Sequence, residues 1–451
     1  MSANATFLRY GSVRHALGLD GRTPIERLAR ATVAATVAGC GLLVLVNFVI
    51  APLLGHFSGQ FEDFGPLLYA GRAAGNGGDI YGAFVPAAQS SLVTNLGFDY
   101  LPVVAVLARP LTALPHNVAV IAWLWIILGC TIAGSIIIAR DTLPANWPRT
   151  AIGFCVAVLF APAIYNVWHG QMNAVVFLSL AVALRAWIRG DEVTCGVALG
   201  LGGVAKVAPA VLLLLLLRRG WWRGALAGAA TVAAALVTGG VLLGFDRLHE
   251  WFTRVLPVLG RADGWFFNES ANGIVNRLAN HNVVRLDAPN IALQFTVTIV
   301  AVAILLGAVA VVRHGVATAE RRQLEFSAAV AAMLLAGGIT WYSAYGALAL
   351  PLMVVAGLAA RRHVNRRVIG AAAVIGVVAG VAAPIFLAAG GESWVIGSRG
   401  TVWWWPALQV DSIPAYALTL LFVALLVTLA RGRARERPGS ISGERLRRAA
   451  A

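Results

Sequence analysis

Repeated apolar runs of about 20 residues dominate this sequence and constrain what the chain can fold into. A helix of that length crosses the ~30 Å hydrocarbon core of a bilayer. Hydrophobic residues make up 59% of the 451 residues and charged residues 12%, whereas soluble domains average roughly 45–50% and 25%. We therefore predict an all-α polytopic membrane protein rather than a soluble fold.

The net charge of +15 raises the question of a nucleic-acid partner, but its distribution indicates a membrane topology. Arginines cluster in short loops between apolar runs, as at Arg218-Arg219, at Arg361-Arg362 and in the tail from Arg431. Cytoplasmic loops of membrane proteins carry such an excess of positive charge. The basic residues are not interleaved with aromatic side chains on which bases could stack, so we expect no nucleic-acid partner.

Taking the basic loops as cytoplasmic gives the topology. We predict a cytoplasmic segment over 1–30, a single transmembrane domain over 31–430 and a basic cytoplasmic tail over 431–451. We expect both termini on the cytoplasmic side of the plasma membrane and the first span to be a retained anchor rather than a cleaved signal peptide. About twelve spans are expected, near 31–52, 117–139, 150–168, 172–187, 193–204, 207–217, 224–244, 291–312, 324–340, 344–360, 367–388 and 412–430.

Three large outer loops, near 53–116, 245–290 and 389–411, hold most of the polar residues. Within the first loop, the apolar stretch 98–115 is short and broken by prolines. Counting it as a span would move every later loop to the opposite side of the membrane, against the positive-inside rule. We interpret it as an interfacial or re-entrant helix.

The run 193–217 begins and ends beside cytoplasmic charges and carries Lys206 and Pro209 at its middle. We predict two short helices that meet inside the membrane, where irregular backbone is tolerated only against protein or a watery cavity. Lys206 is the only lysine of the chain. A cation at that depth costs a few kcal/mol or more and usually lines a functional cavity. The alternatives are a snorkelling lysine and a contact between helices.

An acidic pair, Glu62-Asp63, follows the first apolar run on the outer side. Anchoring explains this pair poorly, whereas a carboxylate there could remove a proton from a hydroxyl beside a lipid-borne substrate. Asp63 could instead be an interfacial charge or a helix cap. Glu62 could raise the proton affinity of Asp63, bind the acceptor or face water.

Other chemistries lack support in the sequence. No GxxxxGK[ST] phosphate loop is present, and the cytoplasmic connections leave no room for a nucleotide-binding domain. The four cysteines and eight histidines show no metal-ligand spacing. We expect neither a cofactor nor a metal, although a divalent ion near Glu62-Asp63 is left open. A secondary transporter is the alternative from another class, because it also combines many spans with a broken helix; a structural or flippase subunit is a third.

Five blocks of sequence, in order, resemble the glycosyltransferases of family 87, which are membrane enzymes with a C-type glycosyltransferase fold. The resemblance covers about residues 30–430. The blocks are Glu62-Asp63-Phe64 with Gly78-Asp79-Ile80-Tyr81, Tyr100-Leu101-Pro102 with Arg109-Pro110-Leu111, Gly170-Gln171-Met172-Asn173, Gly200-Leu201 with Lys206-Val207-Ala208-Pro209, and Asn268-Glu269-Ser270-Ala271-Asn272-Gly273.

The resemblance implies that the domain over 31–430 is catalytic. Such enzymes move a sugar, with inversion, from a polyprenyl-phosphate carrier to a glycolipid or envelope glycan on the extracytoplasmic face. Mannose is the sugar that the resemblance favours, and arabinofuranose is the alternative. The expected partners are therefore the lipid-linked sugar donor, the lipid-linked glycan acceptor and membrane lipids.

The catalytic aspartate of the family maps onto Asp63, which we expect to be the general base. An ammonium is a strong point charge for phosphate, so we expect Lys206 to bind the donor phosphate, helped by Arg72, Arg261 or His169. The side chains expected to contact sugar or acceptor are Glu62, Tyr81, Gln171, Asn173, Asn268, Asn272 and Tyr345. Many family members have histidine where this chain has Trp341, Tyr342 and Tyr345, so no histidine contact is carried over. Aromatic residues there suit sugar stacking but also suit a membrane interface.

Overall fold

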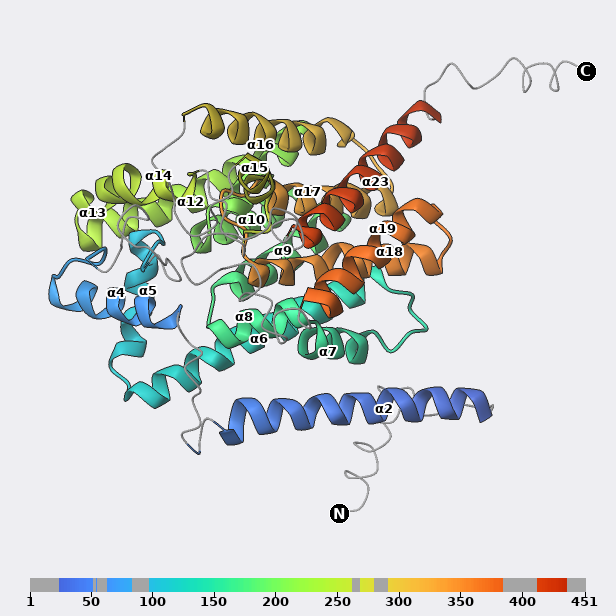
Figure 1. Cartoon of the computed structure of the whole chain (residues 1–451), viewed down its shortest axis with the longest axis horizontal. Coiled ribbons are helices and arrows are strands. Elements are labelled where there is room, and N and C mark those ends of the chain that lie inside the picture. The colour runs from blue at the N-terminus through green and yellow to red at the C-terminus, as the bar shows by residue number, and fades with distance from the viewer. Residues whose placement is uncertain are drawn as a thin grey trace, which may run out of the picture.

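The computed structural model of the chain is all-helical (Figure 1). It describes residues 24–51, 54, 63–82, 97–261, 268–279, 291–383 and 412–435. Within these ranges every regular element is a helix, as predicted. Glu62 and the third outer loop, 389–411, lie outside the described residues.

The helices follow the apolar runs of the sequence closely. In chain order, with η for 3-10 or π segments, they are α2 (Pro24–Leu45), η1 (Val46–Ile50), α4 (Phe64–Asn76), α5 (Pro102–Thr112), α6 (His116–Thr142), α7 (Arg149–Leu159), α8 (Ala161–His169), α9 (Asn173–Arg189), α10 (Glu192–Ala205), η3 (Ala208–Leu212), α11 (Leu213–Arg219), α12 (Trp222–Leu243), α13 (Phe245–Glu250), η4 (Trp251–Val255), α14 (Leu256–Leu259), α15 (Ala271–Ala279), α16 (Ile291–Val311), α17 (Ala319–Ala336), η5 (Tyr342–Leu348), α18 (Ala349–Ala360), α19 (Arg366–Val377), η6 (Val378–Ala382) and α23 (Ile413–Arg435).

Five of the described helices are long and apolar enough to cross a membrane, or six if one bent pair counts as a single span. The five are His116–Thr142, Trp222–Leu243, Ile291–Val311, Tyr342–Ala360 and Ile413–Arg431. Several of the other predicted spans correspond to shorter helices, so the total of about twelve stays a prediction. The short helix expected within 98–115 is present as α5, which is 11 residues long and contains Pro110.

One predicted span has a different shape from the one expected. The run 150–168 is divided into α7 and α8, which meet at an angle of 59°. Phe160 between them has a non-helical backbone (φ −75°, ψ 109°), and Pro162 stands in the first turn of α8. Proline has no N–H to donate to the preceding turn, so the position favours the start of a new helix over the continuation of the old one.

The predicted break at Lys206 is confirmed. Helix α10 ends at Ala205, and Lys206 is extended (φ −151°, ψ 138°). The 3-10 segment η3 begins at Ala208 with Pro209 in its first turn and leads directly into α11. The two short helices therefore meet at the only lysine of the chain.

Glycines hold α10 tightly against α12. A Cβ atom on Gly196 would fall on the carbonyl oxygen of Gly224, and one on Gly200 would lie 2.7 Å from the carbonyl oxygen of Gly228. Small residues four apart on facing helices let two backbones approach in this way, which is how helices associate in an apolar medium. This close contact supports the short helix that ends at the break.

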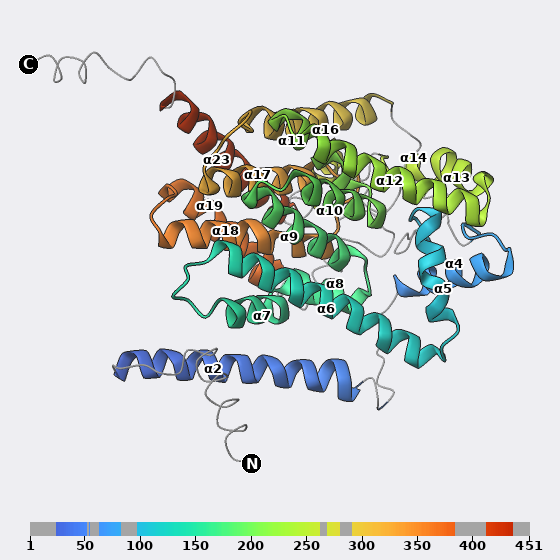
Figure 2. The ribbon, with the colours of Figure 1, turned by 180° about the vertical axis from the view of Figure 1, so that it is seen from behind.

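The elements of the predicted outer loops gather at one end of the bundle. Helices α4, α5, α13 and α14 lie together on the left in Figure 1 and on the right in Figure 2, which shows the opposite side. The loop between α18 and α19 and the C-terminal end of α23 lie at the other end. Helix α2 runs along the side and packs on α7, where Cys40 contacts Ala157 and Val158.

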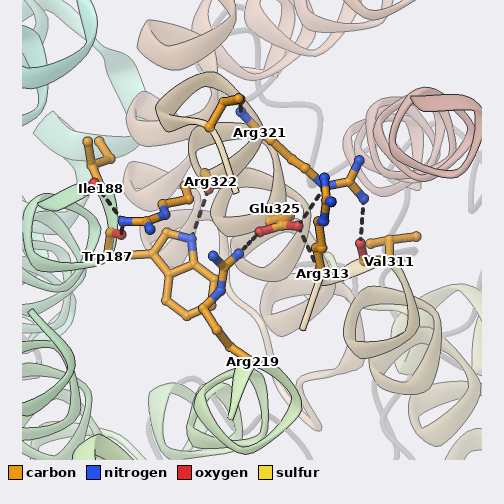
Figure 3. A network of polar contacts seen from close by, with 9 residues as sticks. Trp187, Ile188, Arg219, Val311, Arg313, Arg321, Arg322 and Glu325 are labelled. Carbon is orange, nitrogen blue, oxygen red and sulfur yellow. Dashed lines mark hydrogen bonds and ion pairs between the residues drawn. The ribbon is translucent and has the colours of Figure 1, made fainter. Parts of the chain in front are cut away.

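A buried ionic cluster joins several helices around Glu325 of α17, and Figure 3 shows it from close by. The Glu325 carboxylate, which is fully buried, accepts hydrogen bonds from the Arg219 guanidinium, from Nε of Arg321 (3.0 Å) and from the backbone N–H of Arg313 (2.9 Å). Arg219 also lies 4.2 Å from the ring centre of Trp187, in cation–π geometry. The cluster therefore connects α9, α11 and α17 with the residues that follow α16.

Replacing Glu325 with Gln should lower the free energy of unfolding by on the order of 3–5 kcal/mol, because buried Arg219 and Arg321 would lose their compensating charge. Thermal unfolding of the purified protein in detergent measures the change. Glu320→Gln is the matched control, since Glu320 lies on the same helix with a side chain 40% exposed. Equal stability of the two variants would contradict the structural role of Glu325.

Candidate functional site

A cavity of about 460 Å³ lies beside α14, between the residues that precede α4 and α5 and the break after α10. Its wall is formed by the start of α4, the segment 97–101, the break after α10, the residues of η4 and α14, and the segment 337–341. Pockets for small ligands commonly enclose about 300–1,000 Å³. The cavity is therefore large enough for a small ligand or the head of a larger one.

The lining of the cavity is amphiphilic. Charged and amide side chains contribute to it, namely Asp63, Asp99, Gln171 and Lys206. Much of the remaining wall is aliphatic, including Val204, Val207, Val211, Leu256, Leu259 and Leu305. Such a lining suits a ligand that combines charged and hydroxyl groups with a long apolar part.

Asp63 immediately precedes α4 but does not cap it. Its side chain makes no hydrogen bond to the amides of the first turn of α4. Oδ2 of Asp63 instead accepts a hydrogen bond of 2.6 Å from Nε2 of Gln171, which lies between α8 and α9. The helix-cap interpretation of Asp63 is therefore wrong, and the carboxylate belongs to the wall of the cavity.

Two further groups determine which way the Gln171 amide points. Its carbonyl oxygen accepts a hydrogen bond from Nδ2 of Asn173 and another from Oγ of Ser343, each 2.6 Å long. With the carbonyl oxygen so engaged, the NH₂ group of Gln171 faces Asp63. A carboxylate that accepts a hydrogen bond is favoured in its ionised form. The network thus presents Asp63 as a proton acceptor.

Lys206 lines the same cavity from the break between α10 and η3. Among the residues that the structure describes, neither Asp63 nor Asp99 is within the 4.0 Å ion-pair distance of its ammonium nitrogen. Its charge nevertheless acts on Asp99. Lys206 and Asp99 are therefore near enough to interact electrostatically and far enough apart to contact different groups of one ligand.

Asp99 is a site residue that the sequence analysis did not identify. Burial raises the pKa of this carboxyl to about 6; the Lys206 ammonium counteracts the rise, and the charge of Asp63 adds to it. In the sequence, Asp99 is a single acidic residue before an apolar stretch, and no repeating pattern there links it to another site residue. Its position at the start of so apolar a segment was the one sequence signal that could have identified Asp99 as a site residue.

Several predicted contacts support the wall instead of lining it. Nδ2 of Asn268 and Nδ2 of Asn272 both donate to the carbonyl oxygen of Gly338, at 3.0 and 2.6 Å. The Tyr345 hydroxyl donates to the carbonyl oxygen of Glu269, at 2.8 Å. These bonds hold α15 and the residues 268–269 that precede it against the segment 337–341 and η5. Their role in sugar binding stays a prediction.

Four other predicted residues are not part of the cavity lining. The Tyr81 hydroxyl donates to the carbonyl oxygen of Tyr100 (2.9 Å), and Arg72 is exposed on α4. The His169 ring packs against Tyr165, with centroids 4.2 Å apart. Arg261 follows the lining residue Gly260, and its carbonyl oxygen accepts a hydrogen bond from Asn272. Within the described ranges, no group of three His, Cys, Asp or Glu residues could hold a metal ion.

Comparison with known proteins identifies one family. The model of glycosyltransferase family 87 matches residues 98–341, which is more than half of the 451 residues. The matched region includes Asp99, Gln171 and Lys206, whereas Asp63 precedes it. No curated protein matches the chain.

Replacing Asn268 with Ala should destabilise the protein by roughly 2 kcal/mol or more, because buried groups that Asn268 bonds, including the Thr340 N–H and the Gly338 carbonyl, would lose a partner. Thermal unfolding in detergent measures this change. Asn76→Ala, at an exposed position near the end of α4, is the matched control. Unchanged stability together with altered use of acceptors would show that Asn268 binds the acceptor instead.

Proposed function

Because the chain belongs to glycosyltransferase family 87, we propose that it moves a sugar from a polyprenyl-phosphate carrier to a hydroxyl of a glycolipid or envelope glycan. The reaction takes place at the extracytoplasmic face of the plasma membrane. Mannose is the proposed sugar, and arabinofuranose is the alternative. The carrier phosphate already activates the sugar, so the reaction needs no nucleotide or other cofactor.

The observation that carries the proposal is the hydrogen bond from Gln171 to Asp63 in a cavity that Lys206 also lines. A sugar hydroxyl is a poor nucleophile, and a carboxylate within hydrogen-bond reach must accept its proton as it attacks. Gln171 favours the ionised form of Asp63 and orients it. Asp63 is therefore the general base.

The bond changes are those of a direct displacement. The acceptor oxygen attacks the anomeric carbon from the face opposite the phosphate, and its proton passes to Asp63. The bond from the anomeric carbon to the phosphate oxygen breaks, and the polyprenyl phosphate leaves with the electron pair. Negative charge grows on the phosphate, so a positioned cation in a water-poor cavity stabilises the transition state. Lys206 is that cation.

The apolar lining suits the carrier lipid. Aliphatic side chains from η3, α14 and α16 lie in the same cavity as Lys206. A polyprenyl chain leaves hydrocarbon surroundings only at high cost, so the cavity receives its donor sideways from the bilayer. The proposed setting is a C-type fold of about twelve spans, with both termini in the cytoplasm and the cavity at the outer end.

A secondary transporter is the second candidate function. The break between α10 and η3 beside a charged residue is the observation that favours it, because transporters bind substrates at broken helices. Protein-dependent uptake of a soluble solute into vesicles would support this function. Transfer of labelled mannose from polyprenyl phosphate to lipid in the same membranes would support the enzyme.

Asp63→Asn should lower the rate of sugar transfer at least 100-fold, because the amide cannot accept the proton of the acceptor hydroxyl. The measurement is transfer from labelled polyprenyl-phosphate sugar by purified protein, with the unfolding midpoint of each variant as a check on folding. Asp246→Asn, at an exposed position on α13, is the matched control and should transfer at the wild-type rate. Turnover retained by folded Asp63→Asn would exclude Asp63 as the base.

Gln171→Leu should lower kcat roughly tenfold or more with a smaller change in KM, because Asp63 would lose the donor that orients it and favours its ionised form. Steady-state kinetics with labelled polyprenyl-phosphate sugar measure both constants. An unchanged kcat in folded Gln171→Leu would mean that Gln171 acts only in packing.

A further inference from the structure

Asp99 lines the cavity beside the packed rings of its two neighbours. The Phe98 ring lies 5.6 Å from the Tyr100 ring and 5.6 Å from the Tyr81 ring, measured between centroids. Phe98 is fully buried in this aromatic group, whereas Asp99 lines the cavity. The carboxylate position therefore follows from how Phe98 and Tyr100 pack.

The backbone around Asp99 is also held in place. The Trp251 indole N–H donates to the carbonyl oxygen of Asp99 (3.1 Å), and the Tyr81 hydroxyl donates to the carbonyl oxygen of Tyr100 (2.9 Å). Oδ1 of Asp79 in turn accepts from the Tyr81 N–H and from Arg247, each at 2.9 Å. Asp79 and Tyr81 thus position Asp99, although neither lines the cavity.

The surrounding charges place Asp99 with the reacting groups. Lys206 and Asp63 both act on the Asp99 carboxylate, and the three residues line one cavity. A ligand that meets Lys206 with a phosphate therefore brings its neighbouring groups to Asp99. A carboxylate in its ionised form only accepts hydrogen bonds, so the group it meets must be a donor.

In a sugar linked to phosphate at the anomeric carbon, two oxygens lie next to that carbon besides the phosphate. The ring oxygen only accepts hydrogen bonds, whereas the hydroxyl on the adjacent carbon donates one. Hydrogen bonds to this hydroxyl strengthen as the ring gains positive charge in glycosyl transfer. On the basis of the proposed function, we propose that Asp99 binds the donor sugar through this 2-hydroxyl and stabilises the positive charge on the ring in the transition state.

The site therefore selects donors that carry a 2-hydroxyl. Without that hydroxyl, the buried carboxylate would lose the hydrogen bond that compensates for its desolvation in the complex. Sites built to hydrogen-bond a substrate hydroxyl discriminate strongly against analogues that lack it.

The test compares two donors: the polyprenyl-phosphate sugar that the wild type uses, either mannose or arabinofuranose, and its 2-deoxy form. For wild type, kcat/KM should be higher with the natural sugar by roughly 100-fold or more. For Asp99→Ala, the preference should fall to within a few-fold, because the hydroxyl has lost its partner. Asp99→Asn, which keeps a hydrogen-bond acceptor but not the charge, should retain part of the preference at a lower kcat.

A preference that persists unchanged in folded Asp99→Ala would overturn the proposal, because a purely structural role lowers the rate with both donors equally. Transfer of neither donor by wild type would overturn the proposed function instead. The Asp246→Asn variant, altered at an exposed acid on α13, should keep the wild-type preference.

The pH profile gives a second readout. The charged and titratable groups that act on Asp99 or are influenced by it are Lys206, Asp63, Tyr81 and Tyr100. Asp99 has a pKa of about 6 and is ionised above it. The wild-type kcat/KM should therefore fall as the pH drops through about 6, and this limb should move to lower pH in Asp99→Asn. An unchanged limb in Asp99→Asn would contradict ionised Asp99 as the group that binds the hydroxyl.

Discussion

A helix in an apolar environment can be interrupted only where the protein itself shields or hydrogen-bonds the backbone N–H and C=O groups that the interruption leaves without a helical partner. The break at Lys206 meets this condition. Its N–H still donates to the carbonyl oxygen of Gly202 at 2.8 Å, and the N–H of Ala210 donates to that of Val207 at 3.0 Å. Gly196 and Gly224 let α12 support the shortened helix from the side. The cavity depends on this break, because it brings a cation to the wall while the N–H groups of Lys206 and Ala210 keep their partners.

The two groups of charges, one around Glu325 and one around the cavity, differ in arrangement, and the difference indicates different roles. At Glu325, the carboxylate bonds directly to Arg219 and Arg321, so its charge is compensated within the protein. Around the cavity, Lys206 and Asp63 both act on Asp99, and all three residues line one wall. Compensated charges join helices. Charges that line a cavity can meet a ligand, and the cost of placing like and unlike charges there is offset when a ligand completes the set.

Much of this arrangement follows from local patterns in the sequence. Apolar length predicted the helices, and Lys206 with Pro209 predicted the broken run, because each signal acts within a few residues. The bend at Phe160 was not predicted, because the run around it is apolar on both sides of the bend. Ser343 and Asp99 were not predicted as site residues for another reason. Ser343 bonds to Gln171 across 172 positions of sequence, and only the packed bundle brings such residues together. Asp63 and Gln171 were each predicted as site residues, but their hydrogen bond, across 108 positions, was visible only in the structure.

The hydrogen bonds in this network run in one direction, because Asn173 and Ser343 donate to Gln171 and Gln171 donates to Asp63. This direction has a consequence for the path of the proton. An amide neither takes up nor releases a proton at neutral pH, so Gln171 orients Asp63 but cannot relay a proton away from it. In the proposed reaction, the proton taken from the acceptor therefore leaves Asp63 toward the cavity, where the departing phosphate or water can accept it. The base is reset from the ligand side, and the hydrogen bonds behind it are unchanged through turnover.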